Sequence, residues 1–227
     1  MKKIIVFGFP HCGTSIMKSI IGHIEGVEEI YSEKFSVGRP SSNNETEYKL
    51  CKWPFTEPKF FKTEYDEYIK IFIVRNPLYV FSSINNRVLN EDPGYNHSVD
   101  HYIDTIKHFN YYKENNKKNL YLIRYEDLFD NNYKNIKDIF NSIGFNYTDK
   151  IFENSNFVNK IGECIVNPLD KSPVATDHLR YRTWQLNQNF ENNNGKTKIN
   201  LTSIQRNTIL KSVDIKKSYP NIINCIK

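Results

Sequence analysis

Residues 3–15 read Lys3-Ile4-Ile5-Val6-Phe7-Gly8-Phe9-Pro10-His11-Cys12-Gly13-Thr14-Ser15. The apolar, β-branched run at the start of this stretch is typical of a buried strand, and the glycine- and proline-containing segment after it is typical of a tight loop. Apolar residues then recur at helical spacing, namely Ile16, Met17, Ile20, Ile21 and Ile24. A strand, loop and helix N-terminus in this order favour a bound anion, because free backbone N–H groups and the helix dipole both attract negative charge.

The glycine spacing of this loop is that of the Walker A motif, but the lysine of that motif is absent. Gly8, Gly13 and Ser15 stand at Walker A positions, and Thr14 occupies the place of the lysine. The loop is therefore suited to a phosphate group, yet it lacks the cation that binds a β/γ-phosphate pair.

The composition is that of a soluble protein. The 227 residues are 25% charged with a formal net charge of +5, and the mean hydropathy is −0.61. No apolar run approaches the roughly 20 residues that span a bilayer, and the four cysteines have neither metal-ligand nor disulfide-framework spacing. We expect a cytoplasmic protein with a single domain over residues 1–227 and no membrane span. The charge is too small and too dispersed to predict nucleic-acid binding.

Strand and helix patterns alternate along the rest of the chain. The expected elements are strands over 48–51, 68–74 and 120–123, helices over 78–89, 99–112, 133–143 and 202–212, and polar loops over 38–47 and 187–196. Such alternation predicts an α/β fold of three layers, in which a central, mainly parallel sheet is flanked by helices on both faces.

A second motif lies at the end of the expected strand 68–74. Arg75 follows that strand in Val74-Arg75-Asn76-Pro77, and Ser83 lies eight positions later, about two turns into the next helix. Ligands of open α/β sheets bind beyond the carboxyl ends of the strands. An arginine together with a hydroxyl suits a phosphate monoester, although pairing of Arg75 with a carboxylate is an equally good alternative.

A third motif, Arg124-Tyr125-Glu126-Asp127-Leu128, follows the expected strand 120–123. We expect its polar residues to join strand to helix rather than to contact substrate.

The three motifs, in this order, resemble those of the PAPS-dependent sulfotransferases, where PAPS is 3′-phosphoadenosine 5′-phosphosulfate. Residues 8–15 resemble the 5′-phosphosulfate loop of that family, and Arg75-Asn76-Pro77 with Ser83 resembles its 3′-phosphate motif. Residues 124–128 are similar to its Tyr-Glu-Asp-Leu segment, so that the resemblance covers about residues 3–145.

The resemblance implies a P-loop NTPase-like fold and transfer of a sulfuryl group from PAPS to a hydroxyl or amine, without a metal, leaving adenosine 3′,5′-bisphosphate. Because PAPS has no β/γ-phosphate pair, the absent Walker lysine fits this donor. The loop residues implied to bind the 5′-phosphosulfate are Pro10, His11, Cys12, Gly13, Thr14 and Ser15. Arg75 and Ser83 are implied to bind the 3′-phosphate. Arg180 and Arg182 could reach the same phosphate from residues 179–184, which are similar to the family's C-terminal segment but lack its glycine.

Catalytic roles follow less directly, because the chain departs from the family at several positions. His11 stands where the family usually has Lys or Arg, and it is the candidate for stabilising charge on the leaving phosphate oxygen. Lys52 is a candidate sulfate contact, with an ordinary surface lysine as the alternative. Many cytosolic members use a histidine in a Lys-Thr-His segment, which has no histidine here, whereas other members use a Glu soon after the first helix. Residues 23–27 followed by Glu33 resemble that layout, so we assign the base that deprotonates the acceptor to Glu33. The alternatives for this base are Glu29, Glu57, His97 and His101.

Three other interpretations stay open. His11-Cys12 followed by Lys18 partly imitates the His-Cys-x5-Arg loop of cysteine phosphatases, and a helix N-terminus lowers the pKa of a thiol. The chain also fits a P-loop kinase with a degenerate Walker A loop, or a nucleotide-binding homologue without activity. The expected partner is a small-molecule or glycan acceptor, and no motif identifies that acceptor or the oligomeric state.

Overall fold

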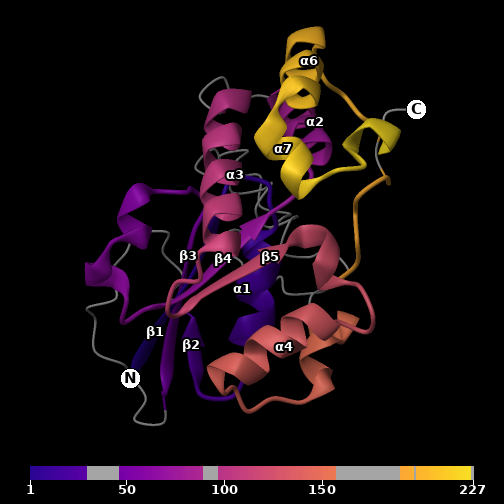
Figure 1. The fold of residues 1–227 in the computed structure, drawn as a ribbon. Coiled ribbons are helices and arrows are strands. Elements are labelled where there is room, and N and C mark those ends of the chain that lie inside the picture. The colour runs from indigo at the N-terminus through magenta and orange to yellow at the C-terminus, as the bar shows by residue number, and fades with distance from the viewer. Residues whose placement is uncertain (30–45, 89–96, 157–189, 197, 226–227) are drawn as a thin grey trace, which may run out of the picture.

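Five parallel strands form one sheet in the order β2-β3-β1-β4-β5 (Figure 1). In this computed structural model the described residues are 1–29, 46–88, 97–156, 190–196 and 198–225. β1 (Lys2–Gly8) is central, between β3 (Tyr48–Trp53) and β4 (Ile69–Val74). β2 (Val27–Glu29) and β5 (Leu120–Arg124) form the edges. The predicted α/β fold with a parallel sheet is confirmed, and β2 is a strand that the sequence did not predict.

Helices cover both faces of the sheet (Figure 1). One face carries α1 (Thr14–Gly22) and α4 (Lys134–Ile143). The helices of the other face are α2 (Pro77–Val88) and α3 (Val99–Glu114), with α6 (Ser203–Lys211) and α7 (Val213–Ser218) packed against them. The short 3-10 turns are η1 (Pro58–Phe61), η2 (Thr63–Tyr65), η3 (Tyr125–Leu128), η4 (Asp149–Phe152), η5 (Asn154–Asn156) and η7 (Ile222–Cys225).

Residues 4–7 of the central strand β1 are continuously apolar because both faces of the strand are covered there. Ile4 and Val6 pack on the α1 and α4 side, whereas Ile5 and Phe7 pack on the α2 and α3 side. Successive side chains of a strand point to opposite faces, so a strand covered on both faces needs an apolar residue at every position. Gly8 ends this strand, and a Cβ atom at this position would lie 2.1 Å from the Ile73 carbonyl oxygen of β4. Because glycine has no Cβ, the chain can turn this close to its neighbour.

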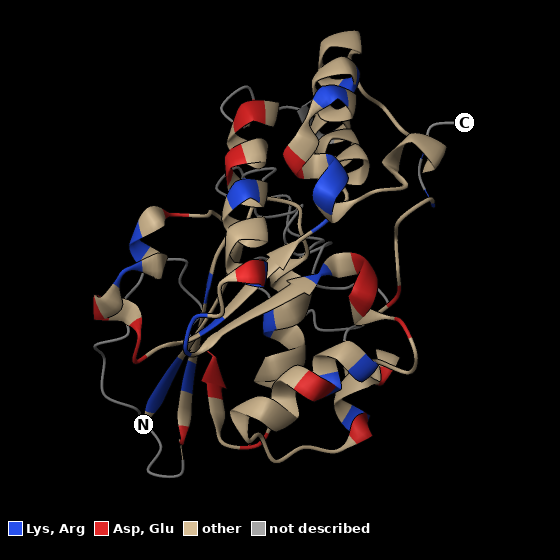
Figure 2. Cartoon of the chain, viewed as in Figure 1, with Lys and Arg blue, Asp and Glu red and all other residues tan. Residues whose placement is uncertain are grey.

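Each strand and helix that the sequence predicted between residues 3 and 145 is present, and the helix expected over 202–212 is α6. α7 follows it after a single residue, Ser212, whose hydroxyl caps α7. The loop expected over 38–47 lies almost wholly outside the described residues. Within the described ranges, no helix has the length and apolar character that crossing a membrane requires. Basic and acidic residues are interspersed over most described elements (Figure 2).

Candidate functional site

The loop between β1 and α1 leaves the first turn of the helix without a side-chain cap. His11 and Gly13 both have left-handed backbones, with φ of 64° and 98°. Gly13 is the N-cap residue of α1 and provides no side-chain cap, so no cap side chain occupies the N–H groups of the first turn. A Cβ on Gly13 would lie 2.5 Å from Cδ2 of Tyr125. This position therefore needs glycine both for its backbone and for its space.

The structure brings the loop into contact with the motif after β4. The Nδ1 atom of His11 lies 2.7 Å from the Ser83 hydroxyl on α2. Arg75 donates from Nη1 to the carbonyl oxygen of His11 at 3.2 Å. Both motifs follow neighbouring strands, β1 and β4, and parallel strands present their carboxyl ends at one edge of the sheet. The two motifs that the sequence analysis expects to bind phosphate therefore contact each other at this edge of the sheet.

Arg75 is half-buried and is oriented by several neighbours. Its guanidinium carbon lies 4.3 Å from the centre of the Tyr125 ring, an arrangement that favours a cation over an aromatic face. Its Nε donates to Oδ1 of Asn194 at 2.8 Å, and its carbonyl oxygen accepts a hydrogen bond from the Tyr102 hydroxyl. Among the described residues no carboxylate forms an ion pair with Arg75. The alternative role of a structural ion pair is therefore not supported.

The third motif joins strands and loops, as the sequence indicated. Arg124 binds both oxygens of Asp127 at 2.7 Å. Oε1 of Glu126 accepts from the backbone N–H of Asn76 at 2.8 Å and from Nδ2 of Asn194 at 2.7 Å. Burial raises the pKa of Glu126, while these two hydrogen bonds and the charge of Arg75 act in the opposite direction. The carboxyl of Glu126 thus holds the backbone of the residue after Arg75, and Asn194 links it to Arg75 itself.

Lys52 approaches the loop from the other side, at the end of β3. Its Nζ donates to the Ser15 hydroxyl at 2.8 Å, and the side chain is only 9% exposed. Burial, and then the positive charge of Lys18, lower the pKa of Lys52 to about 7. The alternative of an ordinary surface lysine is therefore wrong. Lys18 itself forms an ion pair with Glu29 at 3.0 Å. Glu29, an alternative candidate for the base, is therefore engaged with a lysine.

Cys12 lies in the loop but is unsuited to nucleophilic attack. Its side chain is fully buried, and this burial raises the pKa of the thiol far above its ordinary value. A cysteine phosphatase needs the thiolate at neutral pH, so the structure disfavours that interpretation. Pro10 in the loop and Thr14 at the start of α1 are also buried.

The remaining candidate residues are distributed unevenly. Glu33, Arg180 and Arg182 lie outside the described residues. His97 lies next to Phe9, with 5.5 Å between ring centres, and so is close to the loop. The other two alternative bases are less well placed, since His101 is exposed on α3 and Glu57 pairs with Lys59 at 2.6 Å.

Asn194 is a site residue that the sequence analysis missed. It lies in the segment 187–196, which was interpreted only as a polar loop, yet its side chain bonds both Arg75 and Glu126. The pair Asn194-Gly195 in a polar run predicts a turn, and Gly195 has a φ of 81°. No local signal links such a turn to an arginine far along the chain.

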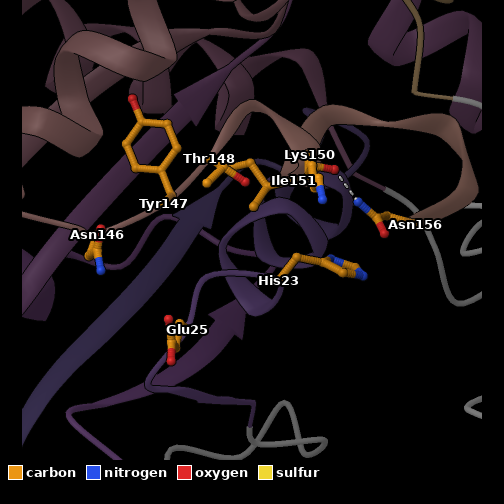
Figure 3. Close-up of a pocket in the computed structure, with 8 residues that line it drawn as sticks. All are labelled: His23, Glu25, Asn146, Tyr147, Thr148, Lys150, Ile151 and Asn156. Atoms are coloured by element: carbon orange, nitrogen blue, oxygen red, sulfur yellow. Dashed lines mark hydrogen bonds between the residues drawn. The ribbon is translucent and has the colours of Figure 1, made fainter.

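A separate cavity of about 260 Å³ lies at the other end of α1 (Figure 3). It is lined by His23, Glu25, Asn146, Tyr147, Thr148, Lys150, Ile151 and Asn156. His23 follows the C-terminus of α1, whereas the loop precedes its N-terminus, so this cavity does not belong to the site. In the ranges that the structure describes, no group of three or more His, Cys, Asp and Glu side chains is arranged to hold a metal ion.

Comparisons with known proteins support the fold rather than a family. No family model and no curated protein sequence matches the chain. Among solved structures the chain is similar to mouse sulfotransferase SULT7A1 complexed with PAP (adenosine 3′,5′-bisphosphate), with a TM-score of 0.61 and 13% sequence identity. The match covers 100% of this chain and 90% of that chain. The α/β fold of this protein is therefore shared with a sulfotransferase over its whole length.

Proposed function

We propose that the protein transfers the sulfuryl group of PAPS to a hydroxyl or amine of a small-molecule or glycan acceptor. The observation that carries this proposal is the junction of His11 with Ser83 and Arg75, at 2.7 and 3.2 Å. It places a helix N-terminus beside an arginine and a hydroxyl, which suits one nucleotide with anionic groups at both its 5′ and 3′ positions. The fold shared with a PAP-bound sulfotransferase supports the same conclusion.

Each side chain then has a defined role in an in-line displacement at sulfur. The first turn of α1 and Lys52 bind the 5′-phosphosulfate, and Arg75 with Ser83 binds the 3′-phosphate. As the acceptor oxygen or nitrogen bonds to sulfur, the bond from sulfur to the phosphate oxygen breaks and its electron pair stays on that oxygen. His11 donates a hydrogen bond to this leaving oxygen, and Glu33 takes the acceptor proton. Donors placed in advance where charge develops provide most of such catalysis.

A thermal-shift titration tests this assignment. Adenosine 3′,5′-bisphosphate (PAP) at about a hundred times its Kd is expected to raise the melting temperature of a chain of this size by about 5–10 °C. ATP with Mg²⁺ is expected to give a much smaller shift, because Thr14 stands where the Walker A lysine would bind the β- and γ-phosphates. Stabilisation by Mg²⁺-ATP alone would overturn the proposed function and favour the P-loop kinase alternative.

Substitution of His11 separates catalysis from binding. Asparagine tolerates the left-handed backbone of this position, where φ is 64°. Its amide retains a hydrogen-bond donor, but unlike histidine it cannot be protonated to a cation. We expect His11→Asn to lower the rate of sulfuryl transfer from labelled PAPS about tenfold, with the Kd of PAP changed less than about threefold. A variant with the full transfer rate would remove His11 from the chemistry, and a wild-type protein that binds PAP without transfer would be a binding homologue.

A further inference from the structure

The carboxamide of Asn194 bridges a cation and a carboxyl group. Its Oδ1 accepts from Nε of Arg75 at 2.8 Å, and its Nδ2 donates to Oε1 of Glu126 at 2.7 Å. This orientation of the amide is chemically fixed, because a guanidinium has only donors and a carboxylate has only acceptors. Asparagine is therefore the residue type that satisfies both neighbours at this length.

The backbone around Asn194 is held over the same arginine. The N–H of Asn194 donates to Oδ1 of Asn192 at 2.9 Å. The Tyr125 hydroxyl donates to the Glu191 carbonyl at 3.3 Å and accepts from the N–H of Asn193 at 3.4 Å. Because the ring of Tyr125 stacks on Arg75, the turn that carries Asn194 and the stacking partner of Arg75 are fixed together.

These contacts leave one end of the guanidinium for a ligand. Nε is bonded to Asn194 and Nη1 to the His11 carbonyl, and one face lies on the Tyr125 ring. Nη2 forms no hydrogen bond with any described residue, and the side chain is only half-buried. An anion at Arg75 therefore meets a guanidinium whose orientation is already set, which lowers the entropic cost of binding it.

We propose that Asn194 determines selectivity for nucleotides with a 3′-phosphate, by holding Arg75 in the orientation that binds this group. The inference rests on the proposed function, in which Arg75 contacts the 3′-phosphate. Asn194 is a positioning residue, since its amide is already used by Arg75 and Glu126. Loss of the amide lets the guanidinium rotate, whereas a carboxylate at this position competes with phosphate for Arg75 and repels Glu126.

The test compares two nucleotides that differ only in the 3′-phosphate. Calorimetric titration of the full chain gives the Kd of PAP and of adenosine 5′-monophosphate, and their ratio measures selectivity. We expect Asn194→Ala to reduce this ratio about tenfold and the isosteric Asn194→Asp about thirtyfold, as loss of a hydrogen bond to a charged group suggests. Asn146→Ala is the matched control, because Asn146 is exposed and lies beyond the far end of α1.

The outcomes distinguish failure of this inference from failure of the proposed function. A selectivity ratio that is unchanged in both variants would overturn the role of Asn194, even if the affinities for both nucleotides fall. The melting temperature of each ligand-free variant identifies a folding defect, and Asn194→Asp keeps the test valid if the alanine variant is unstable. If the wild-type protein does not prefer PAP to the monophosphate, the proposed function itself is wrong.

Discussion

Replacement of Arg75 by alanine is expected to weaken PAP binding at least about 100-fold, because truncation of one partner of a charged, hydrogen-bonded pair costs about 3 kcal/mol or more. The thermal shift with PAP should then fall to about 1 °C or less at a hundred times the wild-type Kd. The loss has two sources. The variant lacks the cation for the 3′-phosphate, and it also lacks the bond from Nη1 to the His11 carbonyl, 3.2 Å long, that ties the 5′ loop to β4.

Arg75→Lys separates these two sources. Lysine keeps the charge but cannot reproduce the fork that bonds Asn194 and the His11 carbonyl at the same time. We expect an affinity between those of the wild-type and alanine proteins, with a reduced preference for PAP over adenosine 5′-monophosphate. Ser83→Ala, which removes one neutral hydroxyl, should cost only about tenfold. A thermal shift with PAP that is unchanged in Arg75→Ala would exclude Arg75 from the site.

The sequence predicted most of the fold because, in the central strands and helices, the apolar residues in the sequence are the ones that are buried in the structure. Residues 4–7 of β1 and 71–74 of β4 are covered on both faces and are continuously apolar, and α4 is followed by its C-cap Gly144, whose φ is 84°. β2 was missed because it has only three residues, two of them glutamates. Its pairing with β3 stabilises a segment whose own pattern does not indicate a strand. The single domain over residues 1–227 stays a prediction.

The site was predictable where its residues follow one another in short motifs. The loop at 8–15 and the pair Arg75 and Ser83 have spacings that reflect one strand end and one helix. Asn194 is 119 positions from Arg75, and only folding brings the two together. The burial of Lys52 likewise depends on packing against α1, which its neighbours along β3 do not reveal. Glu33, Arg180 and Arg182 stay predictions.

Substitution of Lys52 by methionine is expected to weaken PAP binding about 100-fold below pH 7, because it removes a cation from the 5′ end of the site. In the ligand-free protein, burial and the nearby charge of Lys18 lower the pKa of Lys52 from 10.5 to about 7. A bound anion favours the protonated amine and raises this pKa again. Above pH 7 the wild-type protein must therefore take up a proton as it binds PAP.

The sign of the pH dependence follows from this uptake. PAP affinity is highest below pH 7, where Lys52 is already protonated, and falls up to about tenfold per pH unit above it. The phosphate groups add no slope there, since their second ionisation, with a pKa near about 6, is complete. Calorimetry at pH 6.5, 7.5 and 8.5, in buffers of different ionisation enthalpy, measures both the affinity and the protons bound. Lys52→Met should show weak binding that is independent of pH over this range.

The ligand-free protein provides an independent measurement of the same group. Because the folded-state pKa of Lys52 is lowered, this group binds more protons in the unfolded chain between pH 7 and 10.5, so its contribution to the free energy of unfolding rises with pH there. The slope reaches at most about 1.4 kcal/mol per pH unit. Lys52→Met should remove this rise, whereas Lys107→Met, at an exposed position on α3, should leave it unchanged. A wild-type PAP affinity that is constant from pH 6.5 to 8.5 would show that Lys52 does not meet the bound anion.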